Sequence, residues 1–387
     1  MITSVCFVEK CRVDRVLENF KSGILYAVTC SINCPFSLCV LRVPCGKILN
    51  HKGHKENVRL LTLRSIYIDM SNISWKSEFR QSITDVDELC RILAIPVCSV
   101  RTDYPLLVPR SFVDLMERGN PNDPLLLQVL PQAEENQTVQ GFSKDPLGEI
   151  ADAQHCAALK KYAGRMLLLV SNECGIHCRF CFRRHFPKVP VSPDVKTFLA
   201  LIQNDTTIEE VILSGGDPLM LDDDMLNYLL QSILQIKHVQ RIRIHSRLPI
   251  VLPNRLTPKL AAILTLPIPV YLVLHVNHPN ELGGDFLERR ELLTKPIVMA
   301  QTVLLRRINN DVEILTRLFR RLVDARILPY YLHQLDRVEG AAHFEVVPEA
   351  GIRILAELRE RLPGYAVPVY VREIGGKMCK EIITEST

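Results

Sequence analysis

Three cysteines lie within one short segment, Cys174-Gly-Ile-His-Cys178-Arg-Phe-Cys181. Iron–sulfur clusters of the four-iron, four-sulfur (4Fe–4S) type are held by cysteine thiolates and normally take four of them. Three thiolates in one loop can bind three irons and leave the fourth open, which is what a catalytic metal requires. The structural alternative is three free cysteines in a loop, and so compact a run disfavours it.

A glycine pair and two late lysines are the next candidates for chemistry. Ser214-Gly215-Gly216-Asp217 closes a strand-like segment, and its glycines allow the backbone to approach a ligand closely. Lys377 and Lys380 follow a second pair, Gly375-Gly376. A lysine amine condenses with an aldehyde cofactor when burial or a cationic neighbour suppresses its charge. The alternative for both lysines is a surface position in a C-terminal tail.

From Arg165 onwards the sequence alternates short apolar strands with capped or amphipathic helices. We expect strands at Met166–Val170, Glu210–Leu213, Ile242–Ser246, Val270–Val276, Ile297–Val303 and Ile327–His333, and helices at Asp222–Ile236, Thr257–Leu264, Asp311–Ala325 and Pro348–Arg361. Six such units predict a parallel sheet with right-handed crossovers. Functional residues at the strand ends favour an α/β fold of the incomplete (β/α)6 TIM-like barrel type.

With this barrel included, the chain divides into four regions. Residues 70–158 are predicted to be helical, with a capped helix after Thr84-Asp85 and a short helix at Arg110–Glu117. Residues 159–363 form the predicted barrel, and residues 364–387 carry a last strand at Ala366–Val371 and the late lysines. Residues 1–69 hold six of the thirteen cysteines and a surplus of basic residues. We expect them to be an extension outside the folded domain, with Met70 as the true start.

Composition excludes several classes of protein. The 387 residues are 47% hydrophobic and 23% charged, which is typical of a soluble globular protein. A net charge of +4 gives no support for a nucleic-acid partner. The uncharged run Ser22–Leu41 contains too many polar residues for a membrane span, and acidic residues before it argue against an export signal.

The cysteine triplet resembles that of the radical S-adenosylmethionine (radical SAM) superfamily. Further stretches resemble its lysine 2,3-aminomutase family, closest to the bacterial branch that serves β-lysylation of elongation factor P. The matches run in order from about residue 75 to residue 380: Arg110-Ser111-Phe112, Gly119-Asn120-Pro121, 161–169, 182–186, 214–220, 243–253, 277–281, 303–306, 329–333 and 340–344. Residues 1–69 find no counterpart in the family.

The resemblance implies three cofactors, which are a 4Fe–4S cluster, S-adenosylmethionine (SAM) and pyridoxal 5′-phosphate (PLP). The implied cluster ligands are Cys174, Cys178 and Cys181; Ser214, Gly215, Gly216, Asp217, His275 and Gln301 are implied at the SAM site, and Lys161 and Arg165 at the PLP site. The family keeps an acidic residue seven positions before its PLP lysine. Glu373 is seven before Lys380 and four before Lys377. The resemblance therefore favours Lys380, with Lys377 as the alternative.

The implied substrate is free L-lysine. The resemblance assigns Arg183 to its carboxylate, a geometry that a guanidinium suits, and Asp336 and Glu373 to its ε-ammonium. The implied enzyme is an isomerase that makes (R)-β-lysine by 2,3-amino migration and supplies it for modification of elongation factor P. The alternatives are a free-standing metabolic lysine 2,3-aminomutase and a non-enzymatic iron–sulfur or zinc module. Glu373, where metabolic enzymes carry Asp, and His333 favour the β-lysylation branch.

The resemblance also implies partners and a location. A reducing donor of the flavodoxin or ferredoxin type would supply the electron, and a lysyl ligase would link the product to elongation factor P. No nucleic acid or membrane is expected. A cluster that oxygen destroys, in a chain with no export signal, predicts a cytoplasmic protein.

Overall fold

The computed structural model describes residues 74–151, 153, 157–186 and 195–384, and the strand residues 13–16, 19–20, 23–24 and 27–30. Contacts divide the chain into two units, Met1–Tyr67 and Ile68–Thr387. In the first unit β1 (Val13–Val16) pairs with β4 (Ala27–Cys30), and β2 (Asn19–Phe20) pairs with β3 (Gly23–Ile24), both antiparallel. Met70 and most of residues 1–69, on which the predicted extension falls, lie outside the described residues.

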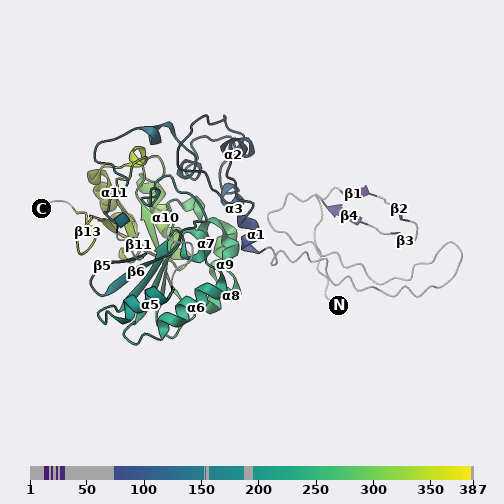
Figure 1. The fold of residues 1–387 in the computed structure, drawn as a ribbon. Coiled ribbons are helices and arrows are strands. Elements are labelled where there is room, and N and C mark those ends of the chain that lie inside the picture. The colour runs from purple at the N-terminus through teal and green to yellow at the C-terminus, as the bar shows by residue number, and fades with distance from the viewer. Residues whose placement is uncertain are drawn as a thin grey trace. The chain divides into compact units, whose positions relative to one another are not determined.

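A nine-stranded sheet organises the second unit (Figure 1). Its strands are β5 (Ala158–Tyr162), β6 (Arg165–Ser171), β7 (Glu210–Gly215), β8 (Arg241–Ser246), β9 (Val270–His275), β10 (Ile297–Val303), β11 (Leu328–His333), β12 (Val369–Arg372) and β13 (Glu381–Ile382). They lie side by side in chain order. The strands from β6 to β12 are parallel, and β5 and β13 run antiparallel at the two edges.

Helices connect the parallel strands and also build the region before the sheet. They are α1 (Trp75–Phe79), α2 (Val86–Leu93), α3 (Arg110–Val113), α5 (Val195–Gln203), α6 (Asp223–Leu234), α7 (Leu248–Val251), α8 (Pro258–Ile263), α9 (Gly284–Arg290), α10 (Val312–Asp324) and α11 (Pro348–Arg361). Short polar side chains cap several of them, as Asp85 does for α2 and Asp311 for α10. None of the helices in the described part of the chain is long and apolar enough to cross a bilayer.

The predicted parallel sheet is confirmed, and its six strands agree with the prediction to within two residues at each end. The helix predicted at Arg110–Glu117 is shorter and ends at Val113, because the chain turns on hydrogen bonds such as that from the Met116 amide to the Val113 carbonyl. Strand β5 was not predicted. Its sequence carries two adjacent lysines and no apolar alternation, as an edge strand can.

The two faces of the sheet have different surroundings. On one face, strand residues such as Leu168, Ile244 and Leu272 pack with the helices in a single apolar core. On the other face Ile212 and Val273 are buried but lie outside that core. Because successive side chains on a strand point to opposite faces, the second face also carries polar residues at the carboxyl ends of the strands: Ser214, His245, His275, Gln301, His333 and, just after β12, Glu373.

An ion pair joins the two edges of the sheet. Lys161 of β5 contacts Glu373, which follows β12, and Tyr162 of β5 donates a hydrogen bond of 2.8 Å to the same carboxylate. The second face, with its polar residues, therefore lies between these two segments and is called here the enclosed face.

Candidate active site

The cysteine triplet lies in the loop after β6, and the region before the sheet holds this loop in place. Between the second and third cysteines, Arg179 is fully buried and pairs with Glu135, which is itself buried. The Arg179 guanidinium also donates to the Tyr104 carbonyl (2.8 Å) and the Thr102 hydroxyl (2.7 Å). A second cation, Arg184, reaches the same Glu135 carboxylate at 2.8 Å. The loop is therefore fixed by a buried ionic contact on each side of Cys181.

The three thiols share an environment that disfavours their charged forms. Burial raises the pKa of Cys174, Cys178 and Cys181, to about 11 for Cys181. Negative charge on neighbouring thiolates raises the pKa of Cys174 and Cys181 further. At Cys178, Arg247 opposes this effect with a hydrogen bond of 2.8 Å to the sulfur. Mutual repulsion of this kind is what a bound metal cation relieves, and metal binding then releases the thiol protons.

The cysteine loop supplies a donor set of three thiols. Among the described residues, no group of three or more His, Cys, Asp or Glu side chains is arranged to hold one metal ion. A cluster makes a different demand, because each thiolate binds a different iron. Cys174, Cys178 and Cys181 are free thiols on one loop that interact electrostatically with one another. These three thiols could therefore each bind a different iron of one cluster.

The glycine pair packs against the cysteine loop. A Cβ on Gly216 would lie 2.3 Å from the Glu173 carbonyl oxygen, and one on Gly215, whose φ is +115°, would lie 2.5 Å from the Ser171 oxygen. The amides of Gly216 and Asp217 donate to those same carbonyls, at 2.6 and 2.7 Å. The close approach expected of the two glycines is thus made, within the protein, to the segment that leads into the cysteines.

The carboxylate of Asp217 is fully engaged by the protein. It accepts hydrogen bonds from the Ser246 hydroxyl and from the amides of Leu219, Arg247 and Leu248, at 2.7 to 3.0 Å. It therefore ties the end of β7 to the end of β8. Ser214, in contrast, turns its hydroxyl to the Arg183 guanidinium at 3.1 Å.

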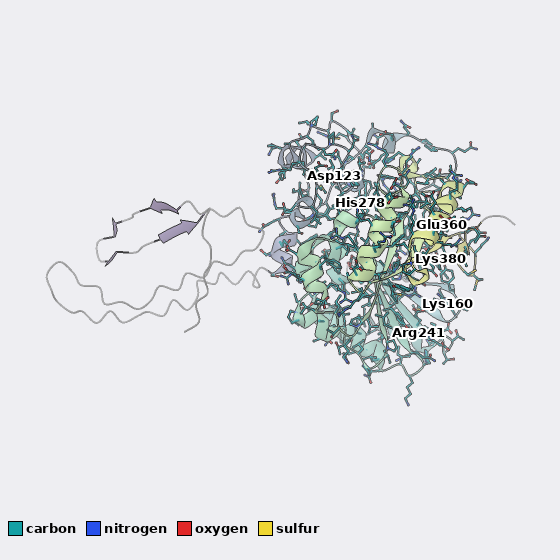
Figure 2. The ribbon with its side chains drawn as sticks, turned by 180° about the vertical axis from the view of Figure 1, so that it is seen from behind. Asp123, Lys160, Arg241, His278, Glu360 and Lys380 are labelled. Carbon is teal, nitrogen blue, oxygen red and sulfur yellow. The ribbon has the colours of Figure 1, made fainter. Side chains whose placement is uncertain are left out.

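The two candidate lysines point in different directions. Lys380, labelled in Figure 2, is one-fifth exposed and pairs with Glu373. Its charge lowers the pKa values of His245 and His333, which places it among the polar residues of the enclosed face. Lys377 is half exposed and pairs with Glu381 at 2.9 Å. Of the two, the geometry thus gives only Lys380 access to the interior.

Lys161 and Arg165 both lie close to the ring of Tyr162. The Arg165 guanidinium is 5.2 Å from the centroid of the Tyr162 ring, and the Lys161 ammonium is 6.0 Å from it. Lys161 also pairs with Glu149, which is buried. Burial lowers the pKa of Lys161, but Glu149 and Glu373 outweigh burial and raise it. The predicted basic pair is therefore brought together at Tyr162, and its lysine is already engaged with two carboxylates.

The pKa values of Asp336 and Glu373 are shifted in opposite directions. Burial raises the pKa of Asp336 to about 7, and the charge of Glu373 adds to this rise. Burial acts in the same sense on Glu373, but Lys380 and Lys161 overcome it and hold the pKa of Glu373 at about 2. Near neutral pH the site thus contains one ionised carboxylate with two lysine partners and one carboxyl that is close to its titration point.

Polar atoms without partners show that the interior suits a polar ligand. Among the described residues, Arg183 Nε and His245 Nε2 are buried and have no hydrogen-bond partner. Burial is the main reason why the pKa of His245 lies well below its ordinary value. Burial also lowers the pKa of His333, to about 3. His275 shares its Nε2 with Asn277 at 3.0 Å. The site therefore offers neutral histidines and an arginine donor, which fit an anionic or heteroaromatic group.

Several residues of the site carried no assigned role in the sequence. Glu149, Tyr162, His245 and Arg247 all contact or face the predicted residues. His245 and Arg247 stand in a stretch that resembles the family, and that signal could have singled them out. Glu135 had no such signal, because its partner Arg179 is 44 positions away in the chain.

Comparison with known proteins found no matching family model. Individual relatives match over most of the chain. The sequence is 42% identical over 326 residues to the L-lysine 2,3-aminomutase of Escherichia coli (strain K12), covering 80% of this chain and 94% of that protein. It is 39% identical over 324 residues to the Haemophilus influenzae enzyme of the same name, covering 81% and 96%. The Clostridium subterminale enzyme is 33% identical over 327 residues, covering 80% and 78%.

Proposed function

The chain belongs to the L-lysine 2,3-aminomutase family, and from this premise we propose that it is an isomerase that converts L-lysine to (R)-β-lysine. The observation that carries the proposal is the position of Lys380, whose amine lies on the enclosed face with the carboxylate of Glu373. The electrostatic coupling of Lys380 to Asp336 places a second carboxyl nearby. Neighbouring side chains would thus present an amine for an aldehyde cofactor and two carboxyls for a distant ammonium.

We propose that Cys174, Cys178 and Cys181 hold a 4Fe–4S cluster and that SAM binds beside it. Ser214, His275 and Gln301 support this site because they lie at or near the carboxyl ends of β7, β9 and β10 on the same face, and Gly215 and Gly216 follow Ser214 directly. Asp217 contributes through its backbone and by fixing β7 to β8, since its carboxylate is already engaged. When bound, the cluster and SAM supply a carbon radical, and PLP supplies a ring that delocalises it.

Lys380 is the proposed attachment point for PLP, and Lys161 and Arg165 are its proposed basic partners. Their positions around Tyr162 support a shared role. The unpartnered His245 Nε2 adds a polar atom that a bound ring or phosphate could satisfy. Lys377 is the alternative attachment point, and its pairing with Glu381 on the surface disfavours it.

The chain's own residues would orient the substrate at its two ends. Arg183 would bind the carboxylate through Nε, which has no partner among the described residues, while its Nη atoms contact Ser214 and Glu149. Glu373 and Asp336 would bind the ε-ammonium. Holding both ends fixes the carbon chain between them, and such positioning is a large part of catalysis by proximity.

The finer architecture is also part of the proposal. We propose that the sheet is the incomplete (β/α)6 barrel of a radical SAM core, which its chain-order strands and single helical face support. Residues 70–158 would be its N-terminal region, and residues 364–387 its PLP segment. Residues 1–69 would lie outside the catalytic domain, and the protein would work in the cytoplasm.

The product would serve modification of elongation factor P. Glu373 and His333, which resemble the β-lysylation branch, support this destination over a metabolic one. A flavodoxin or ferredoxin type of donor would supply the electron. To test this destination, the product is incubated with elongation factor P and its lysyl ligase. The mass of elongation factor P is then measured by mass spectrometry.

The experiment that tests the activity is direct. The protein is reconstituted with iron and sulfide without air and incubated with L-lysine, SAM, PLP and a reductant. We expect (R)-β-lysine, identified by chiral chromatography, and we expect none from the Cys178→Ser variant. Formation of no β-lysine by a protein that carries the full cluster and PLP would reject the proposal.

A further inference from the structure

Arg247 is a buried cation that contacts a proposed cluster ligand. It follows β8, and its side chain is 6% exposed. Its Nη1 lies 2.8 Å from the sulfur of Cys178. Among the hydrogen bonds recorded for the described residues, no other guanidinium donates to one of the three cysteines.

The position of this guanidinium is fixed from several sides. Nη2 donates to Gln128 Oε1 at 2.6 Å and to Glu281 Oε2 at 3.3 Å. The guanidinium also lies 5.7 Å from the ring centroid of Phe112 and 5.6 Å from that of Phe180. Its backbone amide is held by Asp217 at 2.7 Å. The side chain therefore points Nη1 at the sulfur without needing to move.

We propose that Arg247 sets the reduction potential of the cluster by donating a hydrogen bond to the Cys178 thiolate. This inference rests on the proposed function, because it requires the cysteines to hold a cluster. Arginine keeps its charge in proteins, and hydrogen bonds to the sulfurs are among the features that set cluster potentials. Reduction adds an electron and makes the thiolate sulfur a better acceptor. The contact is therefore stronger in the reduced state and raises the potential.

A purely structural role makes different predictions. The Arg247–Glu281 pair could serve only to fill the space between β8 and the region around Gln128. In that case, removal of either partner would lower stability and leave the potential unchanged. If Arg247 tunes the cluster, replacing Arg247 lowers the reduction potential and replacing Glu281 does not, because only Arg247 contacts the sulfur.

The test uses the full chain reconstituted with iron and sulfide, without SAM, and follows the reduced cluster by electron paramagnetic resonance during a redox titration. We expect Arg247→Met to lower the equilibrium constant for reduction about tenfold, which is about 59 mV for one electron. Arg247→Lys keeps the charge, and its reduction potential should lie between those of the wild type and Arg247→Met. This variant preserves the test if the Met variant does not fold. Glu281→Gln should not lower the potential.

Arg255→Met is the matched control. Arg255 is another fully buried arginine, and it pairs with Asp223 and with the carbonyls of Leu219 and Leu221, away from the cysteines. Its potential should equal that of the wild type. An unchanged potential in both Arg247 variants, at wild-type iron content, would overturn the inference and leave the proposed function standing. A wild-type chain that takes up no cluster would overturn both.

Discussion

At the scale of single residues, the two lysines of the C-terminal segment give the clearest prediction. We expect borohydride reduction with PLP, followed by peptide mapping, to place the label on Lys380. Lys380→Ala should reduce labelling more than tenfold, because Lys380 faces the interior while Lys377 pairs with Glu381 on the surface. Lys377→Ala is the control and should label normally. A label on Lys377 in the wild type would refute the assignment.

Asp336 predicts a dependence of stability on pH. Its pKa in the folded protein is about 7, above the ordinary value of 3.8. The folded state therefore holds this proton more tightly than the unfolded state, and stability is lost as pH rises from about 4 to about 7. Asp336→Asn removes this loss. We measure urea unfolding at pH 5, 6, 7 and 8. The free energy of unfolding of Asp336→Asn should rise relative to that of the wild type as pH increases, and the difference should then become constant.

Glu345→Gln serves as the control for this series, because Glu345 pairs with Arg337 nearer the surface. Its difference from the wild type should not follow the same curve. A constant difference between Asp336→Asn and the wild type at all four pH values would contradict the assigned pKa.

At the scale of elements, the turn after β7 depends on glycine. Gly216→Ala would bring a Cβ to 2.3 Å from the backbone oxygen of Glu173, which cannot move without displacing the cysteine loop. We expect a loss of about 1–3 kcal/mol in the free energy of unfolding. Gly364→Ala is the matched control, because nothing lies within 4 Å of its Cβ position. Equal thermal midpoints for the two variants would show that the turn can relax.

The region before the sheet stabilises the cysteine loop through Glu135. Glu135→Ala leaves the buried cations Arg179 and Arg184 without their shared carboxylate. Breaking a buried pair from one side costs about 3–5 kcal/mol. We expect that loss in chemical unfolding, together with a lower iron content after reconstitution. The neighbour Glu134 is exposed, and Glu134→Ala should change neither measurement.

The elements themselves were largely predictable, and their long-range partners were not. Buried parallel strands such as Val270–His275 are continuous apolar runs, so their positions can be predicted from composition alone. Strand β5, with its adjacent lysines, has no such pattern. The cysteine loop and Gly215-Gly216 stood out by spacing. Which carboxylate meets Lys161, or which arginine meets Cys178, depends on contacts between distant segments that no local pattern encodes.

At the scale of the whole molecule, the contact boundary between Tyr67 and Ile68 leads to a prediction on truncation. We expect a chain that starts at Met70 to retain the thermal midpoint and the activity of the full chain. A chain that starts at Ser82 should lose stability, because it lacks α1 and the buried Trp75, whose ring lies 4.7 Å from the Arg255 guanidinium. Loss of activity in the Met70 chain would show that the first unit takes part in catalysis.

The ion pair between Lys380 and Glu373 has a consequence for the order in which ligands arrive. In this structure Glu373 holds the ammonium of Lys380, the same chemical group that the far end of free lysine carries. In the proposed function, the Lys380 ammonium would thus occupy the position that the ε-ammonium of the substrate takes on Glu373. If Lys380 holds the aldehyde cofactor as proposed, Glu373 would keep Lys161 as its one cation and could accept another. Attachment of the cofactor would then create the vacancy that admits the amino acid, so loading would precede recognition.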